Sequence, residues 1–404
     1  MRWTVIVVSS LLSVSLGNPY HSNAVWDFTT VDPSTLGVNT VKQYAGYLDD
    51  DEKNKHLFYW FFGSRNDPFN EPFILWLQGG PGCSGMSGLF FENGPAKNTE
   101  NLTVVRNPDS WNNKANVLYI DQPVNTSCSY GSAVNTTLAA SKDIYALLSL
   151  FFQQFPHGIN LKSILIGNGY VDPYHQVPQY PDMACGRGGL PAIFNSSTCE
   201  AMTAQCYNHR GDTAQCVAGS RACTAVGEPC ERNPYDMRKQ CEGNLTNMCY
   251  QGVDYVTRFL NKPKVRAALG VEVPRWTACS ESMDRAFHAA GDDIQPVHRH
   301  VRTVLEKGVP VLIYAGDVDY ILNWLGQPAW TDALQWSGHR AFLRARTRGL
   351  IMGASSSTRV YGTLKHAEGL AFARVFKAGH LVPMDQPKPI LDLVNRWIGG
   401  EFQK

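Results

Sequence analysis

Two side chains capable of acid–base chemistry follow predicted buried strands in the last third of the chain. Asp319 comes soon after the apolar segment Val309–Tyr314, and His380 comes soon after Ala371–Phe376. In sites with an activated nucleophile, a carboxylate fixes the tautomer of an imidazole, and the imidazole takes the proton from a serine hydroxyl. The order of these two residues predicts the acid–base half of such a site. Taken alone, however, such a pair is more often two ordinary loop residues.

A glycine-rich segment follows another predicted strand. Phe73–Leu77 is a continuous apolar run, and it stops at the sequence Gln78-Gly79-Gly80-Pro81-Gly82. Glycines at such a place let backbone N–H groups approach a developing oxyanion closely. The same residues would also suit a tight turn with positive φ, which is the simpler interpretation of this segment by itself.

The elements that must position these residues follow from apolar patterning. Two antiparallel strands, Gln43–Leu48 and His56–Phe62, are predicted on either side of an acidic turn at Asp49–Glu52. The further buried strands predicted are Phe73–Leu77, Asn116–Ile120, Ser163–Ile166, Val309–Tyr314 and Ala371–Phe376. A helix is predicted over Thr137–Phe155, with its apolar face at Leu138, Ile144, Leu147, Leu148, Phe151, Phe152 and Phe155. Together they predict an α/β fold with a mostly parallel sheet and helices on both faces.

Composition excludes several classes of protein. The 404 residues are 44% apolar and 18% charged, as in ordinary globular proteins, and the formal net charge is +1. We find no basic run of five or more residues, so we expect no nucleic-acid partner and no polybasic membrane patch.

The N-terminus is typical of a signal peptide, which we place at residues 1–17. Arg2 precedes an uncharged apolar run at Val5–Leu16, and Ser15-Leu16-Gly17 resembles a cleavage site. The alternative is an N-terminal buried strand. The run is too short to cross a bilayer, and no later segment is long enough to be transmembrane. Sequons for N-glycosylation begin at Asn101, Asn125, Asn135, Asn195 and Asn244. These features predict the secretory pathway, where cysteines form disulfides.

Eight of the eleven cysteines lie in one segment. They are Cys185, Cys199, Cys206, Cys216, Cys223, Cys230, Cys241 and Cys249. None of their separations is short enough to place two thiolates on one zinc ion, so we expect no metal and no cofactor. We interpret the segment as a disulfide-stapled insertion. Cys83 and Cys279 could bridge distant parts of the chain, which leaves Cys128 without an assigned role. Spacing does not determine the connectivity.

The chain resembles the serine carboxypeptidase family, of the carboxypeptidase Y type, from about Leu36 to its C-terminus. The motifs that carry the resemblance are Ile74–Ser84, Gly88–Pro95, Ser110–Asn112, Asp121–Asn125, Ile166–Gly169, Tyr314–Tyr320 and Gly379–Pro383. The resemblance implies an α/β-hydrolase domain over residues 18–404, with a cysteine-rich cap inserted at about 174–262. It also implies the release of C-terminal amino acids from peptides or proteins through an acyl-enzyme.

The resemblance assigns roles to individual residues. Asp319 and His380 take the acid and base roles, and the N–H of Gly80 is similar to an oxyanion donor. The wall that recognises the free carboxylate of the substrate corresponds to Trp76, Gln78, Gly79 and Glu92. The likeness also pairs Cys83 with Cys279, Cys185 with Cys199, Cys206 with Cys216 and Cys241 with Cys249, which leaves Cys223 with Cys230.

The sequence departs from the family at the nucleophile. The nucleophile elbow reads Gly-x-Ser-x-Gly, and none of the 404 residues belongs to such a pattern. The family places the elbow between a helix that ends near Phe155 and a strand that begins near Ser163. Only His157–Lys162 stands there, so we expect a strand–elbow–helix unit of roughly 30 residues or more to be absent. In addition, Gln78 occupies a position where the family has Asn.

Three functions remain open on the sequence. The first is a serine carboxypeptidase whose chain, as written, lacks its nucleophile and is inactive. The second is a catalytically dead secreted glycoprotein that binds peptides or another partner, and the third is a carboxypeptidase-like acyltransferase or esterase. We expect the protein in the secretory pathway, and the sequence does not decide between secretion and a vacuolar lumen.

Overall fold

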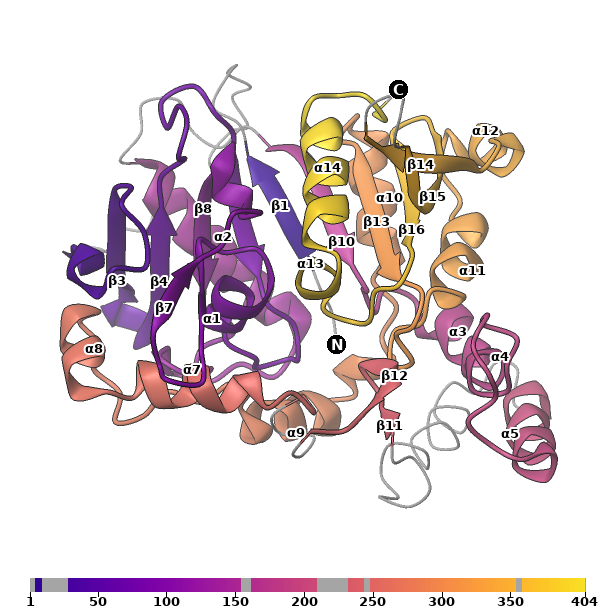
Figure 1. The fold of residues 1–404 in the computed structure, drawn as a ribbon, viewed down its shortest axis with the longest axis horizontal. Coiled ribbons are helices and arrows are strands. Elements are labelled where there is room, and N and C mark those ends of the chain that lie inside the picture. The colour runs from indigo at the N-terminus through magenta and orange to yellow at the C-terminus, as the bar shows by residue number, and fades with distance from the viewer. Residues whose placement is uncertain are drawn as a thin grey trace. The chain divides into compact units, whose positions relative to one another are not determined.

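The computed structural model describes residues 4–8, 28–153, 161–208, 232–242, 248–353 and 358–403. Within them the chain forms two compact units, which we describe separately (Figure 1). The first unit comprises residues 4–162 and 251–292. The second comprises residues 163–250 and 293–404. Across the described ranges, no helix has the length and apolar character needed to cross a membrane.

The first unit contains a sheet in the order β1-β5-β8-β4-β3-β2. The strands are β1 (Thr4–Val8), β2 (Phe28–Val31), β3 (Gln43–Asp50), β4 (Lys55–Phe62), β5 (Phe73–Leu77) and β8 (Asn116–Ile120). Shorter strands are β6 (Ala96–Asn98), β7 (Val104–Arg106) and β9 (Tyr130–Gly131). The predicted hairpin is present, since β3 and β4 pair from Gln43 with Phe62 to Asp50 with Lys55. A short helix η2 (Asp51–Lys53) forms its acidic turn.

The first unit also contains helices. The α-helices are α1 (Gly85–Ser87), α2 (Thr137–Gln153), α7 (Gly252–Leu260), α8 (Pro263–Ala268) and α9 (Glu281–Ala289). Single turns are η1 (Pro33–Leu36), η3 (Gly88–Glu92) and η4 (Trp111–Asn113). The inner face of α2 packs Ile144, Leu147 and Phe151 against β4, β5 and β8. The prediction for Leu138 is wrong, because this side chain in the first turn of α2 is 57% exposed.

The second unit contains a sheet in the order β14-β15-β16-β13-β10. Its strands are β10 (Leu161–Gly167), β13 (Val311–Gly316), β14 (Arg348–Met352), β15 (Arg359–Ala367) and β16 (Leu370–Val375). A separate hairpin is formed by β11 (Arg232–Asn233) and β12 (Asp236–Gln240).

The second unit also contains helices. Those before β13 are α3 (Pro173–Gln176), η5 (Val177–Gln179), α4 (Tyr180–Ala184), α5 (Ser196–Asn208) and α10 (His298–Glu306). Those after β13 are α11 (Gly326–Ala333), α12 (His339–Arg344), α13 (Val382–Asp385) and α14 (Pro387–Ile398). The single turn η7 (Asp292–Ile294) lies at the boundary of the units.

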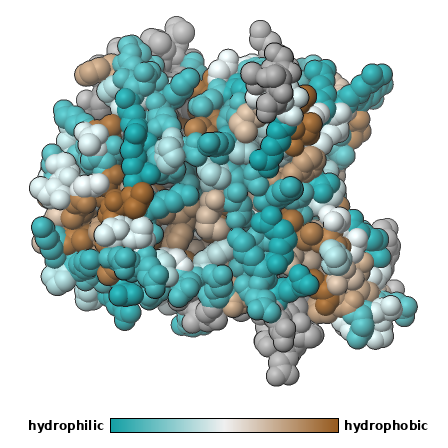
Figure 2. Space-filling model, in the orientation of Figure 1, coloured by the Kyte–Doolittle hydropathy of each residue, from teal (hydrophilic) through white to brown (hydrophobic). Residues whose placement is uncertain are grey.

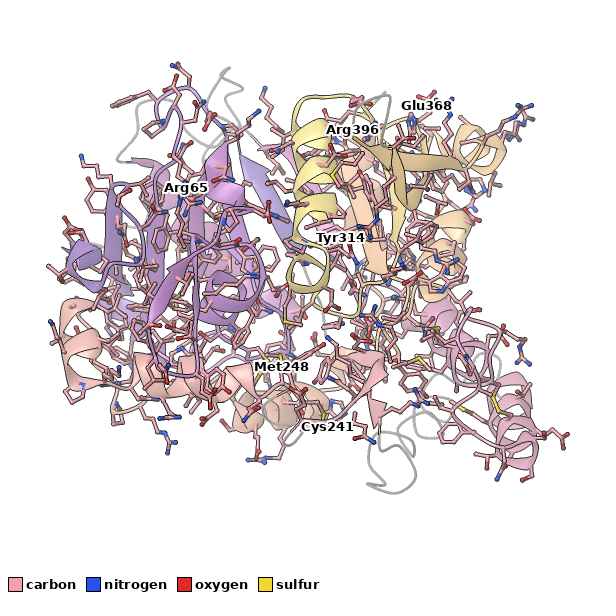
Figure 3. All side chains as sticks on the ribbon, viewed as in Figure 1. Arg65, Cys241, Met248, Tyr314, Glu368 and Arg396 are labelled. Carbon is pink, nitrogen blue, oxygen red and sulfur yellow. A yellow bond between two sulfur atoms is a disulfide. The ribbon has the colours of Figure 1, made fainter. Side chains whose placement is uncertain are left out.

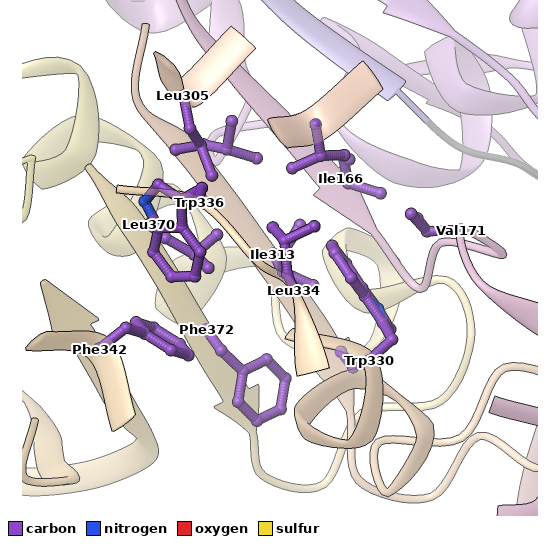
Figure 4. Packing of buried hydrophobic residues seen from close by; sticks show 13 residues of the cluster. Ile166, Val171, Leu305, Ile313, Trp330, Leu334, Trp336, Phe342, Leu370 and Phe372 are labelled. Carbon is purple, nitrogen blue, oxygen red and sulfur yellow. The ribbon is translucent and has the colours of Figure 1, made fainter. Parts of the chain in front are cut away.

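Both faces of β13 are covered, which explains why every residue of this strand is buried. One face packs Val311 and Ile313 against side chains of α10, α11 and α12, including Leu305 and Trp330 (Figure 4). Helix α14 lies over the other face (Figure 1), and five of its side chains, Pro389, Ile390, Leu393, Val394 and Trp397, are buried. A strand enclosed in this way must be apolar along its whole length, as its sequence VLIYAG is.

The sheet is mixed, so the prediction of a mostly parallel sheet is wrong. In the described part, the ladders β5–β8, β10–β13 and β13–β16 are parallel. The ladders β1–β5, β2–β3, β3–β4, β4–β8, β14–β15 and β15–β16 are antiparallel. Short connections account for much of the difference, because neighbouring strands joined by a tight turn pair antiparallel.

The segment Thr4–Val8 is a strand in the structure. Its backbone pairs antiparallel with β5, with Thr4 opposite Leu77 and Val8 opposite Phe73. These five residues lie within the segment 1–17 that we predict to be a signal peptide, and all but Thr4 belong to its apolar run. A run rich in Val and Ile is compatible with a signal peptide, because it is apolar, and with a strand, because β-branched residues favour extended structure.

The exposed surface of the view in Figure 2 is mainly hydrophilic, with hydrophobic residues interspersed. Large apolar side chains that are exposed include Phe69, Tyr145 and Val360.

The core around α2 gives a test of this packing. Leu118 on β8 is fully buried in the cluster that α2 covers. We expect Leu118→Ala to lower the free energy of unfolding by about 2–5 kcal/mol, through lost burial and the cavity that remains. Leu138→Ala is the matched control, because its exposed side chain should change stability by less than about 0.5 kcal/mol. Urea unfolding followed by fluorescence measures both, and similar values for the two variants would contradict the packing described.

Candidate active site

Asp319 and His380 lie together in the second unit. Asp319 stands three residues beyond the end of β13, and His380 stands five residues beyond the end of β16. The two strands are parallel neighbours, so their carboxyl ends meet at one edge of the sheet. His380 Nδ1 is 2.8 Å from Asp319 Oδ2, and both side chains are almost wholly buried. The acid–base pair predicted from the sequence is therefore brought together.

A third residue fixes the carboxylate. Asn168 Nδ2 donates to Asp319 Oδ2 over 2.7 Å, and the backbone N–H of Ile321 donates to Oδ1 over 3.1 Å. Asn168 follows β10 directly and has a positive φ of 43°, a conformation that Asn tolerates better than most residues. Its role was missed in the sequence, where it appeared only within the motif Ile166–Gly169. Its place at the end of a buried strand was the signal that could have identified it.

This arrangement determines what the imidazole can do. Because Nδ1 faces the Asp319 carboxylate, Nδ1 carries the proton and Nε2 holds the lone pair. The ring can therefore accept a proton at Nε2, and the carboxylate stabilises the imidazolium that results.

Trp76, Gln78 and Glu92 form a second polar group, in the first unit. Trp76 Nε1 donates to Gln78 Oε1 over 2.7 Å, and Gln78 Nε2 donates to Glu92 Oε1 over 3.0 Å. All three side chains are buried. Trp76 is on β5, Gln78 follows that strand, and Glu92 ends η3. Amide and carboxyl groups held in this way can form hydrogen bonds with a carboxylate or a carboxylic acid.

The loop after Glu92 is held in place by a half-buried arginine. Arg65, labelled in Figure 3, donates from NH1 to the carbonyl of Asn107 and from NH2 to the carbonyl of Pro95, over 2.7 and 2.8 Å. Burial lowers the pKa of its guanidinium to about 10. Arg65 therefore connects three loops of the first unit on this side of η3.

The glycine turn next to Gln78 has little space. Gly80 has a φ of 154°, and a Cβ there would lie 2.7 Å from the backbone nitrogen of Gly82. The turn is closed by the Cys83 N–H, which donates to the Gly79 carbonyl over 3.2 Å. Only glycine therefore fits at position 80. A residue without a side chain also lets another group approach the backbone N–H closely.

Ser84 and Asp121 form a buried network below this turn. Ser84 Oγ donates to Asp121 Oδ1 over 2.5 Å, and the Cys128 N–H donates to Asp121 Oδ2 over 3.0 Å. Trp276 Nε1 donates to Ser84 Oγ over 3.0 Å. Burial raises the pKa of Asp121 to about 6, although these hydrogen bonds act in the opposite direction. Cys128 is a buried free thiol.

Three of the expected disulfides are present in the described part of the chain. They are Cys83–Cys279, Cys185–Cys199 and Cys241–Cys249. The pairs assigned to Cys206, Cys216, Cys223 and Cys230 lie outside the side chains that the structure describes.

The expected glycosylation sites differ in their surroundings. Asn101, Asn135 and Asn195 are exposed, and Asn244 lies outside the described residues. Asn125 is half-buried, and its amide exchanges two hydrogen bonds with the backbone of Gly131.

The predicted site residues therefore form two groups. Asp319 and His380 belong to the second unit, while Trp76, Gln78, Gly79, Gly80 and Glu92 belong to the first. Among the residues described, no cluster of three or more His, Cys, Asp or Glu side chains could hold a metal ion.

A glycine on η3 gives a test of the Trp76–Gln78 contact. A Cβ at Gly88 would overlap Trp76 Nε1 and lie 2.7 Å from Gln78 Oε1. We expect Gly88→Ala to lower the free energy of unfolding by about 1–3 kcal/mol and to change the tryptophan emission spectrum. Gly63→Ala is the control, because the nearest atom to its Cβ would be 3.5 Å away. Equal behaviour of the two variants would contradict this geometry.

The Asp121 network predicts a dependence of stability on pH. The folded pKa is about 6 and the ordinary value is 3.8, so folding binds a proton between these values. Protonated Asp121 therefore contributes to the free energy of unfolding. This contribution is fully present below pH 3.8 and is lost as the pH rises through about 6. We expect the free energy of unfolding to fall by about 3 kcal/mol more in the wild type than in Asp121→Asn over this range. Urea unfolding at several pH values measures it, with the exposed Asp182→Asn as control. Parallel curves for wild type and Asp121→Asn would contradict the prediction.

Known proteins resemble this chain over most of its length. The family model described as serine carboxypeptidase matches residues 33–158 and 157–400. Carboxypeptidase Y homolog A of Trichophyton verrucosum is 46% identical over 420 residues, covering 92% of this chain and 77% of that protein. Carboxypeptidase Y homolog A of Ajellomyces capsulatus is 47% identical over 418 residues, covering 92% and 76%.

The fold is also similar to that of a solved carboxypeptidase. KEX1(Δ)P, a prohormone-processing carboxypeptidase from Saccharomyces cerevisiae, matches with a TM-score of 0.75 and 21% identity. The match covers 92% of this chain and 94% of that one, which indicates a shared fold. Since the family model matches nearly the whole chain in two adjoining segments, the protein belongs to the serine carboxypeptidase family.

Proposed function

We propose that the complete product of this gene is a serine-type carboxypeptidase that releases C-terminal amino acids from peptides. We further propose that the present chain lacks the unit carrying the nucleophile and is therefore inactive. The observation that carries the proposal is the buried Asp319–His380 pair with Asn168 on the same carboxylate oxygen. This arrangement suits a general base for a serine hydroxyl.

Three findings support the absence of a segment. No Gly-x-Ser-x-Gly occurs in the chain. The two matched segments of the family model adjoin at residues 157–158, where we expect the elbow to be missing. The alignment with the Trichophyton protein extends over 420 residues, although only 92% of the 404 residues here take part. Roughly 50 of its positions thus have no counterpart in this chain, enough for one strand–turn–helix unit.

In the complete enzyme, the reaction would proceed through an acyl-enzyme. The serine oxygen bonds to the scissile carbonyl carbon, and His380 Nε2 takes the hydroxyl proton. The resemblance to the family assigns to the Gly80 N–H the role of donor to the carbonyl oxygen as it becomes negative. His380 then protonates the leaving amine, the C–N bond breaks, and water hydrolyses the ester with His380 again as base. Under this proposal, the present chain lacks the serine that His380 would activate.

Recognition of the substrate would depend on Trp76, Gln78 and Glu92. The amide Nε2 of Gln78, which donates to Glu92 Oε1 in the structure, can also donate to a free C-terminal carboxylate. A Gln side chain is one methylene longer than Asn, so Gln78 would present its amide farther from the β5 backbone than the family residue does. We expect this difference to alter substrate affinity.

A second candidate function is peptide binding without catalysis. The chain retains the hydrogen-bonded Trp76–Gln78–Glu92 group, although it lacks the nucleophile. For either function, we place the protein in the secretory pathway and propose a secreted or vacuolar location.

Sequencing the mRNA and the genomic DNA across the codons for Pro156–Leu161 tests the missing segment. We expect a longer transcript that encodes Gly-x-Ser-x-Gly at this point. If transcript and genome both match the short sequence, the chain is a true deletion and the peptide-binding function is favoured.

Activity measurements test the reaction. We expect the 404-residue chain to show no peptidase activity and no labelling by a fluorophosphonate. In protein with the segment restored, we expect hydrolysis of an N-blocked dipeptide, and Asp319→Asn should lower kcat about 10⁴-fold. The matched control is Asp332→Asn, whose half-buried carboxylate pairs with Lys365 and not with His380, and it should leave kcat unchanged. Serine-directed labelling of the short chain would contradict the proposal.

A further inference from the structure

The loop that carries His380 is held from two sides by groups outside it. The Gly379 N–H donates to Asp385 Oδ2 over 2.7 Å, and the His380 N–H donates to the carbonyl of Tyr235 over 2.7 Å. Asp385 ends α13, and Tyr235 lies in the turn between β11 and β12. Two consecutive peptide groups at the base are therefore fixed by separate parts of the second unit.

This contact is close enough to require a glycine. A Cβ at Gly379 would overlap the Tyr235 carbonyl oxygen and lie 3.1 Å from both Asp236 Cβ and Asp385 Oδ2. The ring of Tyr235 also meets the His380 imidazole edge to face, with centroids 5.5 Å apart. The β11–β12 hairpin thus contacts both the backbone and the ring of the catalytic histidine.

Two cations on β12 hold Asp385. Lys239 Nζ is 3.3 Å from Asp385 Oδ1, and Arg238 NH2 is 3.7 Å from Asp385 Oδ2. The same cations bind the buried Asp236, with Arg238 in a two-point contact of 2.8 and 2.7 Å. Burial disfavours the charge on Asp236, but the Arg238 hydrogen bonds outweigh it and lower the pKa of that carboxyl. Arg238 also donates to the carbonyl of Lys377, over 3.1 Å.

The hairpin belongs to the cysteine-rich segment. Its second strand ends at Gln240, directly before the Cys241–Cys249 disulfide (Figure 3). The segment is thus connected to the histidine loop by charged contacts whose two carboxylates are almost fully buried. Exposed ion pairs contribute little to stability, but a buried carboxylate needs its partners in fixed positions.

We propose that Asp385, anchored by Arg238 and Lys239 of the β11–β12 hairpin, is a positioning residue that sets the His380 imidazole against Asp319. This positioning role rests on the proposed function only in taking His380 as the base. The cysteine-rich segment accordingly has a part in the acid–base pair, beyond covering the domain.

The proton on His380 Nδ1 provides a readout that needs neither a nucleophile nor a substrate. A histidine N–H bonded to a carboxylate gives a downfield ¹H resonance, which can be detected after ¹⁵N-histidine labelling. The resonance is assigned to His380 if it disappears in the variant His380→Gln. In the full chain we expect Asp385→Ala to shift this resonance upfield and to speed its exchange with water. The matched control is Asp182→Ala, which removes an exposed partner of Arg187 in the same unit and should change neither property.

A second variant keeps the test decisive if Asp385→Ala does not fold. Lys239→Met leaves the Asp385 carboxylate bonded to Gly379 and removes one of its anchors, so we expect a smaller shift in the same direction. A resonance with wild-type position and exchange rate in a folded Asp385→Ala overturns the proposal, as does the same result in Lys239→Met when only that variant folds. Failure to restore peptidase activity would count against the proposed function and would leave this result unaffected.

Discussion

One carboxylate oxygen joins the chain segments that follow three strands of the second unit. Asp319 Oδ2 accepts from His380 after β16 and from Asn168 after β10, over 2.8 and 2.7 Å. A carboxylate with no exposed surface is costly unless it is bonded, so these donors make its burial possible. The rest of the unit can be understood from this requirement. Apolar β13 must bring Asp319 to the sheet edge, and helices on both faces must exclude water from it.

Sequence patterns predicted the parts of this arrangement that depend on local periodicity. The buried strands before Asp319 and His380 were apparent because their residues are apolar throughout. The contribution of Asn168 was not, since its left-handed backbone and its contact with Asp319 depend on residues about 150 positions away. The mixed sheet was missed for a similar reason, because strand direction depends on pairing between distant segments. The contacts of Asp385 could not be predicted either, as the cysteine-rich segment has no periodic pattern.

The pairing of β1 with β5 illustrates a constraint on every inner strand of a sheet. An inner strand of a sheet has backbone donors and acceptors on both edges, and both edges need partners. In the first unit, β8 satisfies one edge of β5 in parallel and Thr4–Val8 satisfies the other in antiparallel fashion. The N-terminal run can pair with β5 because ladder hydrogen bonds use backbone groups, and its β-branched residues favour the extended conformation.

The crowded glycines have a consequence for how this sequence can change. At Gly88, Gly316 and Gly379 a single added carbon would overlap a neighbouring group, so each position excludes all other residues without local rearrangement. A substitution at one of these codons is therefore tolerated only if the group that crowds the glycine also moves. At Gly379 that group is the carbonyl oxygen of Tyr235, which belongs to another segment of the chain. These glycines thus couple the divergence of segments that are far apart in the sequence.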